Sequence, residues 1–247
     1  MSTYLRFLKY AVLHRIPKYQ KKLTDLLANE KLKSTLLDLS NQGLELGVVY
    51  DIGARHAEWS STLKKTFSKS NFFLFEANEK CTKILNDSGF KFFIGALSSE
   101  IKTVDFYHND STGDSYYKEN TSFYEEVRPI KKQAITLDSI VKDQNIALPD
   151  FIKLDTQGSE LDILAGGVAC LRHASLVYIE LPILCYNLGA PNFQDYIEFM
   201  KMNNFVPYDI CELHYSNGVM IQVDILFIHD AKLSKINPTF NPSLYFL

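Results

Sequence analysis

Apolar residues at helical spacing mark the beginning of the chain. Leu5, Leu8, Val12 and Ile16 share one helical stripe that stops at Pro17. Further leucines follow at helical spacing up to an Asn-Gln-Gly break at 41–43, which is typical of the end of a helix. We therefore expect an N-terminal helical extension over residues 1–46.

From Gly47 onwards, short apolar runs alternate with longer amphipathic stretches. The apolar runs predict strands buried on both faces at 47–54, 71–78, 90–99, 150–158 and 175–182. The stretches between them predict helices at 56–67, 79–88, 136–145, 159–172 and 192–203. This alternation predicts a doubly wound α/β domain with a parallel sheet and helices on both faces.

The end of the chain departs from this alternation. Two strand-like runs, 206–215 and 219–228, are joined by Ser216, Asn217 and Gly218, and an Asn-Gly turn between such runs is a strong hairpin signal. The sheet is therefore expected to be mostly parallel with a C-terminal antiparallel hairpin, in a domain spanning 47–232. Two Asn-Pro turns then predict an extended tail over 233–247.

Composition and charge exclude several classes of protein. With 247 residues, 46% hydrophobic, the chain can bury a full core, and its net charge of −3 gives no global field for holding nucleic acid. The four cysteines form no C-x-x-C pair, so neither a zinc site nor a disulfide framework is expected.

The N-terminal region differs in charge from the rest of the chain. The first 35 residues carry eight Lys or Arg against two acidic residues, which suits docking on an anionic membrane surface or an acidic partner, or simply a solvated helix face. Charges also interrupt this region too often for a signal peptide or a membrane span. The expected location is cytoplasmic, with the inner face of the membrane as a docking surface.

The turn after the first strand indicates what kind of ligand the sheet can bind. Ligands of open α/β sheets lie outside the carboxyl ends of the strands, here at Asp51-Ile52-Gly53-Ala54. A dinucleotide site needs G-x-G-x-x-G, whereas this turn supplies only Gly53, with Arg55 and Ala57 in place of further glycines. The pattern favours a cofactor without phosphates.

Glu76 closes the second predicted strand, 25 residues after Asp51. A carboxylate at that position can accept two hydrogen bonds from a ribose diol. Asp51 could instead cap the following helix, and Glu76 could be a solvated strand end. Because both acids end neighbouring strands, we favour a nucleoside ligand.

Three stretches give the chain a family resemblance. They are VVYDIGA followed by Trp59, LFEAN with ALSS, and DFIKLDTQGSELDILAGG. Over residues 47–182 the chain resembles the FkbM-type S-adenosylmethionine-dependent methyltransferases. The resemblance implies a Rossmann-like methyltransferase fold whose sheet ends in an antiparallel hairpin, and O-methylation of sugars in surface glycans or of natural products.

The resemblance and the positions of the strand ends imply a set of cofactor-binding residues. The chain also departs from the family pattern in two of the matched stretches. The expected S-adenosylmethionine contacts are Asp51, Gly53, Ala54, Arg55, Glu76, Ala77, Asn78, Ala96, Leu97, Ser98 and Asp155. Arg55 and Ala57 stand where the family commonly has Asn and Gly, and Gln157 stands where it commonly has Glu.

Candidate catalytic side chains lie at the ends of the later strands. Asp155 comes at the carboxyl end of the fourth predicted strand, where it can take the acceptor's proton. Lys153 shares one face of this strand with Asp155 and can hold Asp155 or an acceptor oxygen. Glu180 ends the fifth strand and is a second candidate base. Among the histidines, His214 and His108 are further candidates, although surface or packing roles are common for histidine. Glu160 opens a helix, where a carboxylate can be structural.

A long polar stretch rich in tyrosine, 107–129, separates the third predicted strand from the approach to the fourth. Long loops in compact domains often bind ligands or close over them. The expected acceptor contacts are stacking by Tyr116, Tyr117 and Phe123 and hydrogen bonds from Asp114, Ser115 and Asn120. The alternative is a mobile surface loop.

The sequence therefore favours an S-adenosylmethionine-dependent O-methyltransferase that acts on a sugar or glycan hydroxyl. Two alternatives remain: an oxidoreductase that uses NAD or a nucleotide sugar, and a non-catalytic scaffold that docks glycan enzymes through its basic N-terminal region. No metal is expected, although Asp155, Glu180 and a histidine could converge on Mg²⁺.

Overall fold

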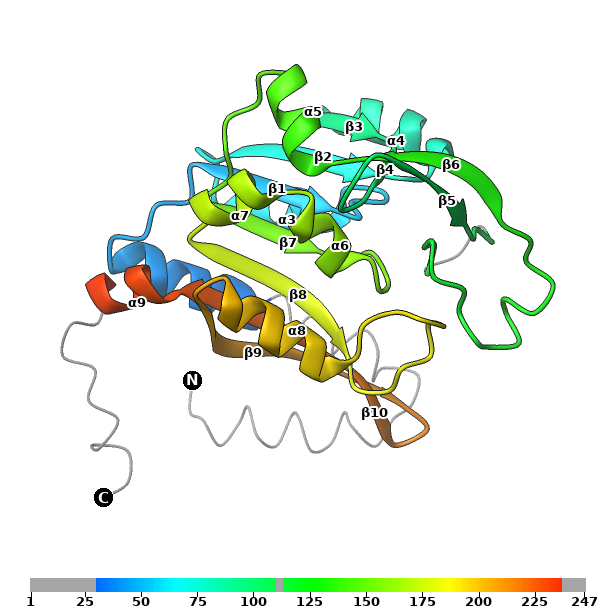
Figure 1. Ribbon diagram of the computed structural model, residues 1–247. Coiled ribbons are helices and arrows are strands. Elements are labelled where there is room, and N and C mark those ends of the chain that lie inside the picture. Colours follow the sequence, from blue (N-terminus) through cyan, green and yellow to red (C-terminus); the bar gives the residue numbers. More distant parts are fainter. Residues whose placement is uncertain (1–29, 110–112, 237–247) are drawn as a thin grey trace.

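The computed structural model describes residues 30–109 and 113–236 and contains a seven-stranded mixed sheet. Its strands are β1 Val48–Ile52, β2 Asn71–Glu76, β3 Lys91–Ile94, β7 Phe151–Leu154, β8 Leu176–Pro182, β9 Phe205–Ser216 and β10 Val219–His229. They lie in the order β3-β2-β1-β7-β8-β10-β9 (Figure 1). All neighbouring pairs are parallel except β8–β10 and β10–β9.

Each face of this sheet has its own hydrophobic core. One core contains side chains of α5 Leu137–Asp143, α6 Glu160–Ala165, α7 Val168–His173 and α8 Phe193–Met202, which Figure 1 shows in front of the sheet. The other contains side chains of the helix over 30–41 and of α3 Glu58–Thr66, η1 Glu79–Cys81, α4 Thr82–Ser88 and α9 Asp230–Ile236. The domain is therefore the predicted α/β fold with helices on both faces.

The described part of the predicted N-terminal extension packs directly on this domain. Leu32, Leu36 and Leu39 are buried in the second core, and Asp209 of β9 accepts hydrogen bonds from Lys31 Nζ at 2.5 Å and Thr35 Oγ1 at 2.6 Å. The predicted helix at 5–16 and most of the extended tail lie outside the described residues. The domain boundaries stay predictions. The boundary predicted after residue 232 falls inside α9, which continues to Ile236.

The C-terminal hairpin is confirmed, and its turn has the expected geometry. Asn217 and Gly218 both have positive φ, 50° and 80°, as a two-residue hairpin turn of the primed type requires. The register between β9 and β10 shifts at three places, including one beside Asp224. Such bulges often occur next to functional sites, where they re-aim side chains.

The single strand predicted over 90–99 is wrong. β3 ends at Ile94, and β4 Ala96–Leu97 joins a second sheet with β5 Lys102–Phe106 and β6 Ile130–Ile135, in the order β4-β6-β5. Gly95 lies between the two sheets and donates its N–H to Glu76 O at 2.8 Å. The second sheet was missed because its strands are short and half-exposed, with little apolar pattern.

The single helix predicted over 159–172 is also wrong, because α6 ends at Ala165 and α7 begins at Val168. The break has a packing cause: a Cβ on Gly166 would lie 2.1 Å from the backbone oxygen of Ser98. Only glycine lets the two backbones approach this closely.

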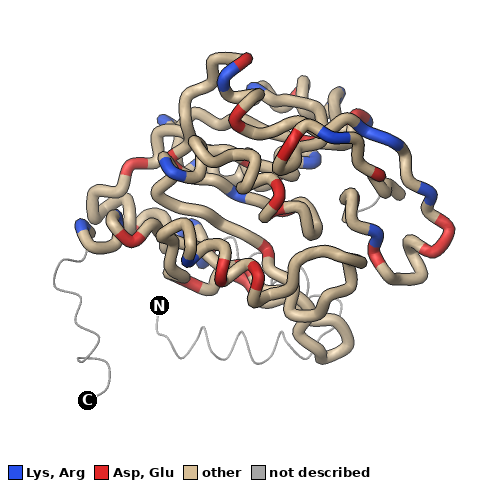
Figure 2. The backbone as a smooth tube through the Cα atoms, viewed as in Figure 1, with Lys and Arg blue, Asp and Glu red and all other residues tan. Residues whose placement is uncertain are grey.

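Charge is mixed over the described chain. Figure 2 shows Lys and Arg positions interspersed with Asp and Glu positions along the backbone. Within residues 30–109 and 113–236, a search for membrane spans finds no helix with the length and apolar character that crossing a bilayer requires.

Candidate active site

A cavity of about 510 Å³ opens at the carboxyl ends of β1, β2, β7 and β8. Between β1 and β7 the strand order reverses: β2 and β3 lie on one side of β1, and β7 and β8 lie on the other. Ligands of open α/β folds usually bind at this position. Most predicted site residues line it, namely Gly53, Ala54, Arg55, Glu76, Ala77, Asn78, Ala96, Leu97, Asp114, Ser115, Tyr116, Lys153, Asp155, Glu180 and His214. Asp51, Ser98, Tyr117 and Asn120 are not among its lining residues.

The turn after β1 brings two backbones into close approach. Gly53 has φ +79°, and a Cβ there would lie 1.9 Å from Asp155 O, so no other residue fits. Arg55 and Ala57 also have positive φ, 45° and 62°. Positive φ is uncommon for residues that carry a Cβ, so the turn holds Arg55 and Ala57 in a strained conformation.

Glu76 ties this turn to the end of β2. Its Oε2 accepts the Arg55 N–H and its Oε1 accepts the Asn78 N–H, both at 2.7 Å. Burial raises the pKa of the Glu76 carboxyl, and the two backbone hydrogen bonds counteract that effect. Each oxygen keeps a further acceptor position. Glu76 can therefore bind a pair of hydroxyls in the cavity while it holds the turn.

Asp51 lies beneath the cavity rather than in its wall, which differs from the predicted direct contact. In β1 it points to the same face as Val49, toward α3, where Ser60 Oγ donates to its Oδ2 at 2.7 Å. Its Oδ1 lies 3.1 Å from Lys153 Nζ. Asp51 is completely buried, so its carboxylate interacts with the Lys153 ammonium group and not with solvent.

Lys153 links this buried acid to the cavity. Its Nζ lies 3.5 Å from Asp155 Oδ2 and donates to Gly53 O at 3.3 Å. Burial alone would lower the pKa of Lys153, but the charges of Asp51 and Asp155 outweigh burial and raise it. The lysine is therefore charged, and it positions Asp155, whose half-exposed side chain faces the cavity.

Glu160 has a structural role at the base of α6. Its carboxylate accepts hydrogen bonds from Thr156 N at 2.8 Å, Gly158 N at 2.9 Å and Tyr196 OH at 2.5 Å. Gln157, between the two N–H donors in the chain, has φ 56°. Glu160 thus holds the strained turn that follows Asp155.

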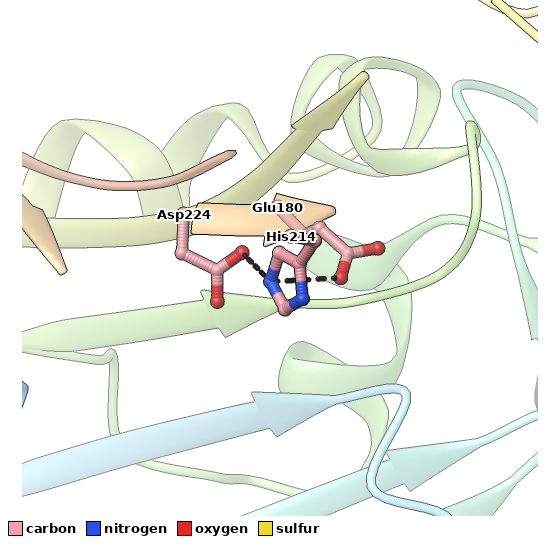
Figure 3. A group of neighbouring side chains, drawn as sticks. All are labelled: Glu180, His214 and Asp224. Carbon is pink, nitrogen blue, oxygen red and sulfur yellow. Dashed lines mark hydrogen bonds and ion pairs between the residues drawn. The ribbon is translucent and has the colours of Figure 1, made fainter. Parts of the chain in front are cut away.

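Three residues from neighbouring strands meet at the other end of the cavity: Glu180 of β8, His214 of β9 and Asp224 of β10 (Figure 3). His214 Nε2 lies 2.9 Å from Asp224 Oδ1 and 3.6 Å from Glu180 Oε2. Burial would lower the pKa of His214, but the hydrogen bond and charge of Asp224, followed by the charges of Glu180 and Glu212, raise it to about 9. Burial, together with the charges of Asp155 and Asp224, raises the pKa of Glu180.

Asp224 is the main residue that the sequence analysis missed. It lies within the apolar run VDILFI of β10, where one polar residue resembles an ordinary outward position. Its Oδ2 accepts a hydrogen bond from Tyr178 OH at 2.7 Å, and it is buried. The signal available in the sequence was a single acid inside the apolar run of a predicted strand, where a charged residue is rare unless it has a partner.

Among the described residues of the polar stretch 107–129, those that line the cavity are Gly113, Asp114, Ser115 and Tyr116. Asp114 accepts a hydrogen bond from Asn78 Nδ2 at 2.9 Å and pairs with His108 Nδ1 at 2.8 Å. Tyr116 donates to Asp162 at 3.0 Å, while Phe123 is 80% exposed. His108 is thus engaged by the loop and does not line the cavity.

The rest of this stretch pairs with the loop after β8. Asn120 N donates to Tyr186 O at 2.7 Å, and Leu188 N donates to Lys118 O at 2.8 Å. Tyr117 packs toward Gly158. Two loops that are distant in sequence are therefore joined next to the cavity.

A seven-stranded sheet with this strand order and a C-terminal antiparallel hairpin is the Rossmann-like methyltransferase fold. Residues 51–207 match the Methyltransferase FkbM domain, and the chain belongs to this family. Family membership implies S-adenosylmethionine as the methyl donor. The acceptor positions that Glu76 keeps beside the cavity fit the hydroxyls of such a donor.

Among curated proteins, the chain is similar to 2-O-methyltransferase NoeI from Sinorhizobium fredii (strain NBRC 101917 / NGR234). The two are 24% identical over 151 residues, which is 54% of this chain and 62% of the relative. The match thus spans less than two thirds of that protein's length.

Solved structures show only distant similarity. Methyltransferase FkbM from Methylobacillus flagellatus KT is 15% identical with a TM-score of 0.45, over 74% of this chain and 43% of the other. Magnesium protoporphyrin IX methyltransferase (ChlM) from Synechocystis PCC 6803 with bound SAM is 9% identical with a TM-score of 0.49, over 87% and 85%. The fold assignment rests on the strand order of this chain itself.

Proposed function

We propose that this protein is an S-adenosylmethionine-dependent O-methyltransferase that acts on a hydroxyl of a sugar or glycan. One observation supports the proposal: the same cavity is lined by the turn after β1 with Glu76 at one end, by a group of carboxyl groups with one imidazole at the other, and by Asp155 between them. Such a cavity suits one nucleoside ligand and one polyhydroxylated acceptor.

The proposed cofactor contacts follow from the geometry at the ends of β1 and β2. Gly53 lets β1 and the end of β7 approach each other and so shapes the turn, while Ala54 lines the cavity beside it. Glu76 would accept hydrogen bonds from the ribose hydroxyls. Ala77, Asn78, Ala96 and Leu97 line the adjoining wall. Arg55 has its backbone N–H engaged by Glu76 and contributes mainly to the shape of the turn.

Asp155 is the proposed proton acceptor. It lies at the carboxyl end of β7, and Lys153 and Gln157 hold its two oxygens, with Gln157 Nε2 3.2 Å from Oδ1. When bound, S-adenosylmethionine supplies a methyl group on a positive sulfur; transfer forms the oxygen–carbon bond, breaks the carbon–sulfur bond and leaves neutral S-adenosylhomocysteine. The hydroxyl proton passes to Asp155, so charge and atoms balance.

A sugar acceptor is supported by the polar character of the acceptor end. Asp114, Ser115 and Tyr116 line it from the loop, and Glu180 and His214 line it from the sheet. Together they supply hydrogen-bonding groups and one aromatic ring. The similarity to a protein named a 2-O-methyltransferase supports oxygen as the atom methylated.

The direct test is methyl transfer from tritiated S-adenosylmethionine to a panel of hexose, deoxyhexose and amino-sugar glycosides. We expect a labelled glycoside that carries one additional methyl group. Replacing Asp155 with Asn should lower the rate by about 10²–10⁴-fold, the usual contribution of a general base, while S-adenosylhomocysteine still binds. Wild-type protein that binds S-adenosylhomocysteine but labels none of the glycosides would reject the sugar acceptor and leave the methyl donor intact.

A further inference from the structure

The acceptor end of the cavity has an unusual charge arrangement. Asp224 of β10 lies directly opposite Glu180 of β8 on one side and Glu212 of β9 on the other. Like charges directly opposite one another destabilise a sheet. Three carboxyl groups therefore stand in one row across three strands, and among the described residues the His214 imidazole contacts all three.

The outer atoms of these residues are already fixed by other side chains. Gln157 Nε2 donates to Glu180 Oε1 at 2.7 Å, and Gln222 Nε2 donates to the same oxygen. Tyr178 OH donates to Asp224 Oδ2 at 2.7 Å, and His214 Nδ1 faces Glu212 Oε1 at 3.8 Å. Residues that bind metals are commonly oriented by such outer contacts, including a carboxylate behind the histidine.

The remaining atoms face one another. Glu180 Oε2, His214 Nε2 and Asp224 Oδ1 come from three strands and converge, as Figure 3 shows, and one ligand atom from each residue lies within 4.8 Å of the others. Two ligands at right angles around an ion with bonds of about 2.1 Å lie about 3 Å apart. The separations from His214 Nε2, 2.9 and 3.6 Å, are close to this value.

We propose that Glu180, His214 and Asp224 form a binding site for one first-row divalent cation such as Mn²⁺. One imidazole and two carboxylates suit such an ion, and three protein ligands leave coordination positions open for water or a substrate. Such an ion would lie between the facing atoms of the three side chains and offset the negative charge of the carboxyl groups around it.

The position of the site gives the ion a role toward the acceptor, and in this respect the inference rests on the proposed function. All three ligands line the same cavity as Asp155. A hydroxyl bound to the ion is more acidic and is held in place, and its proton passes to Asp155 as the oxygen–methyl bond forms. The ion itself is neither oxidised nor reduced.

Mn²⁺ titration of the full chain, after treatment with EDTA and its removal, tests the site. Free Mn²⁺ is followed by electron paramagnetic resonance. We expect one bound Mn²⁺ per chain, and at least about ten-fold weaker binding in each of Glu180→Gln, His214→Gln and Asp224→Asn. The matched control is Asp230→Asn, which removes another carboxylate beside a histidine, 3.2 Å from His229 Nδ1, and should bind Mn²⁺ like the wild type.

Titration of the same samples with S-adenosylhomocysteine separates this inference from the proposed function. Wild type that binds S-adenosylhomocysteine but not Mn²⁺ at millimolar concentration overturns the metal site alone, as do folded variants with unchanged Mn²⁺ affinity. Mn²⁺ binding without S-adenosylhomocysteine binding supports the metal site and rejects the methyl donor. If a ligand variant fails to fold by circular dichroism, Tyr178→Phe replaces it, because it removes only the hydrogen bond to Asp224 and should weaken Mn²⁺ binding about ten-fold.

Discussion

At the scale of single residues, Gly53 decides whether the cofactor turn can form. It combines φ +79° with a Cβ position 1.9 Å from Asp155 O. Gly89 is a matched control, because its φ is +76° and a Cβ there would meet nothing within 4 Å. The two glycines therefore separate conformational cost from steric overlap.

We predict that Gly89→Ala costs about 1–2 kcal/mol of unfolding free energy, the usual cost of a left-handed residue. Gly53→Ala should cost more and also abolish S-adenosylhomocysteine binding, because β1 must move away from β7. Urea unfolding and calorimetry measure both effects. Equal losses in the two variants would show that the close approach to Asp155 has no energetic importance.

The buried pair of Asp51 and Lys153 gives a second prediction at this scale. Lys153→Met leaves Asp51 buried and uncompensated, so we expect a loss of about 3–5 kcal/mol in unfolding free energy. Adding Asp51→Asn should recover part of the loss, with a coupling of about 0.5–3 kcal/mol.

The control is Lys131→Met, which removes an exposed ion pair with Asp105, 2.6 Å long, and should cost no more than about 1 kcal/mol. Urea unfolding of the four variants gives these values. Additive effects of Asp51→Asn and Lys153→Met would contradict the assigned pairing.

The same residues show how far the sequence could specify the site. Asp155, Glu180 and His214 could be predicted because they end strands, and strand ends of a parallel sheet meet at one edge. The Asp51 side chain alternates with Tyr50 and Ile52 and so points to the α3 face, outside the residues that line the cavity. Asp224 could not be placed without knowing that β10 lies between β8 and β9.

At the scale of elements, the break between α6 and α7 depends on a contact from the second sheet. Gly166 has an ordinary φ, so alanine there would meet a steric cost alone, from Ser98 O just after β4. Local sequence could not reveal this contact, because Ser98 and Gly166 are far apart in the chain. The two glycines at 166 and 167 were the only local sign of a break.

We predict that Gly166→Ala lowers the unfolding free energy by about 1–3 kcal/mol, as overpacking does. Gly47→Ala is the comparison, because its Cβ would meet only Asp150 Oδ2, at 3.2 Å, a side-chain atom that accepts one hydrogen bond from Val48 N at 2.9 Å. Its cost should be smaller. An unchanged midpoint of urea unfolding for Gly166→Ala would mean that the break is not set by this contact.

At the scale of the whole molecule, the alternation of strands and helices and the C-terminal hairpin were predictable, because buried strands, helices and an Asn-Gly turn each have a strong pattern. The second sheet was not, because its strands are stabilised by pairing with each other and with the polar loop that they carry. Together, the two sheets and the loop line one cavity, with Glu76 toward one end and Glu180, His214 and Asp224 toward the other.

The central claim, that this cavity binds the methyl donor, is tested most directly by calorimetric titration with S-adenosylhomocysteine. We predict one binding site per chain in the wild type. In Glu76→Gln we expect binding at least about ten-fold weaker, because hydrogen bonds to a charged group contribute about 1.5–3 kcal/mol. In Glu45→Gln, whose side chain is exposed before β1, we expect unchanged binding. Wild-type protein that gives no heat of binding, or a Glu76→Gln variant that binds as tightly as wild type, would contradict it.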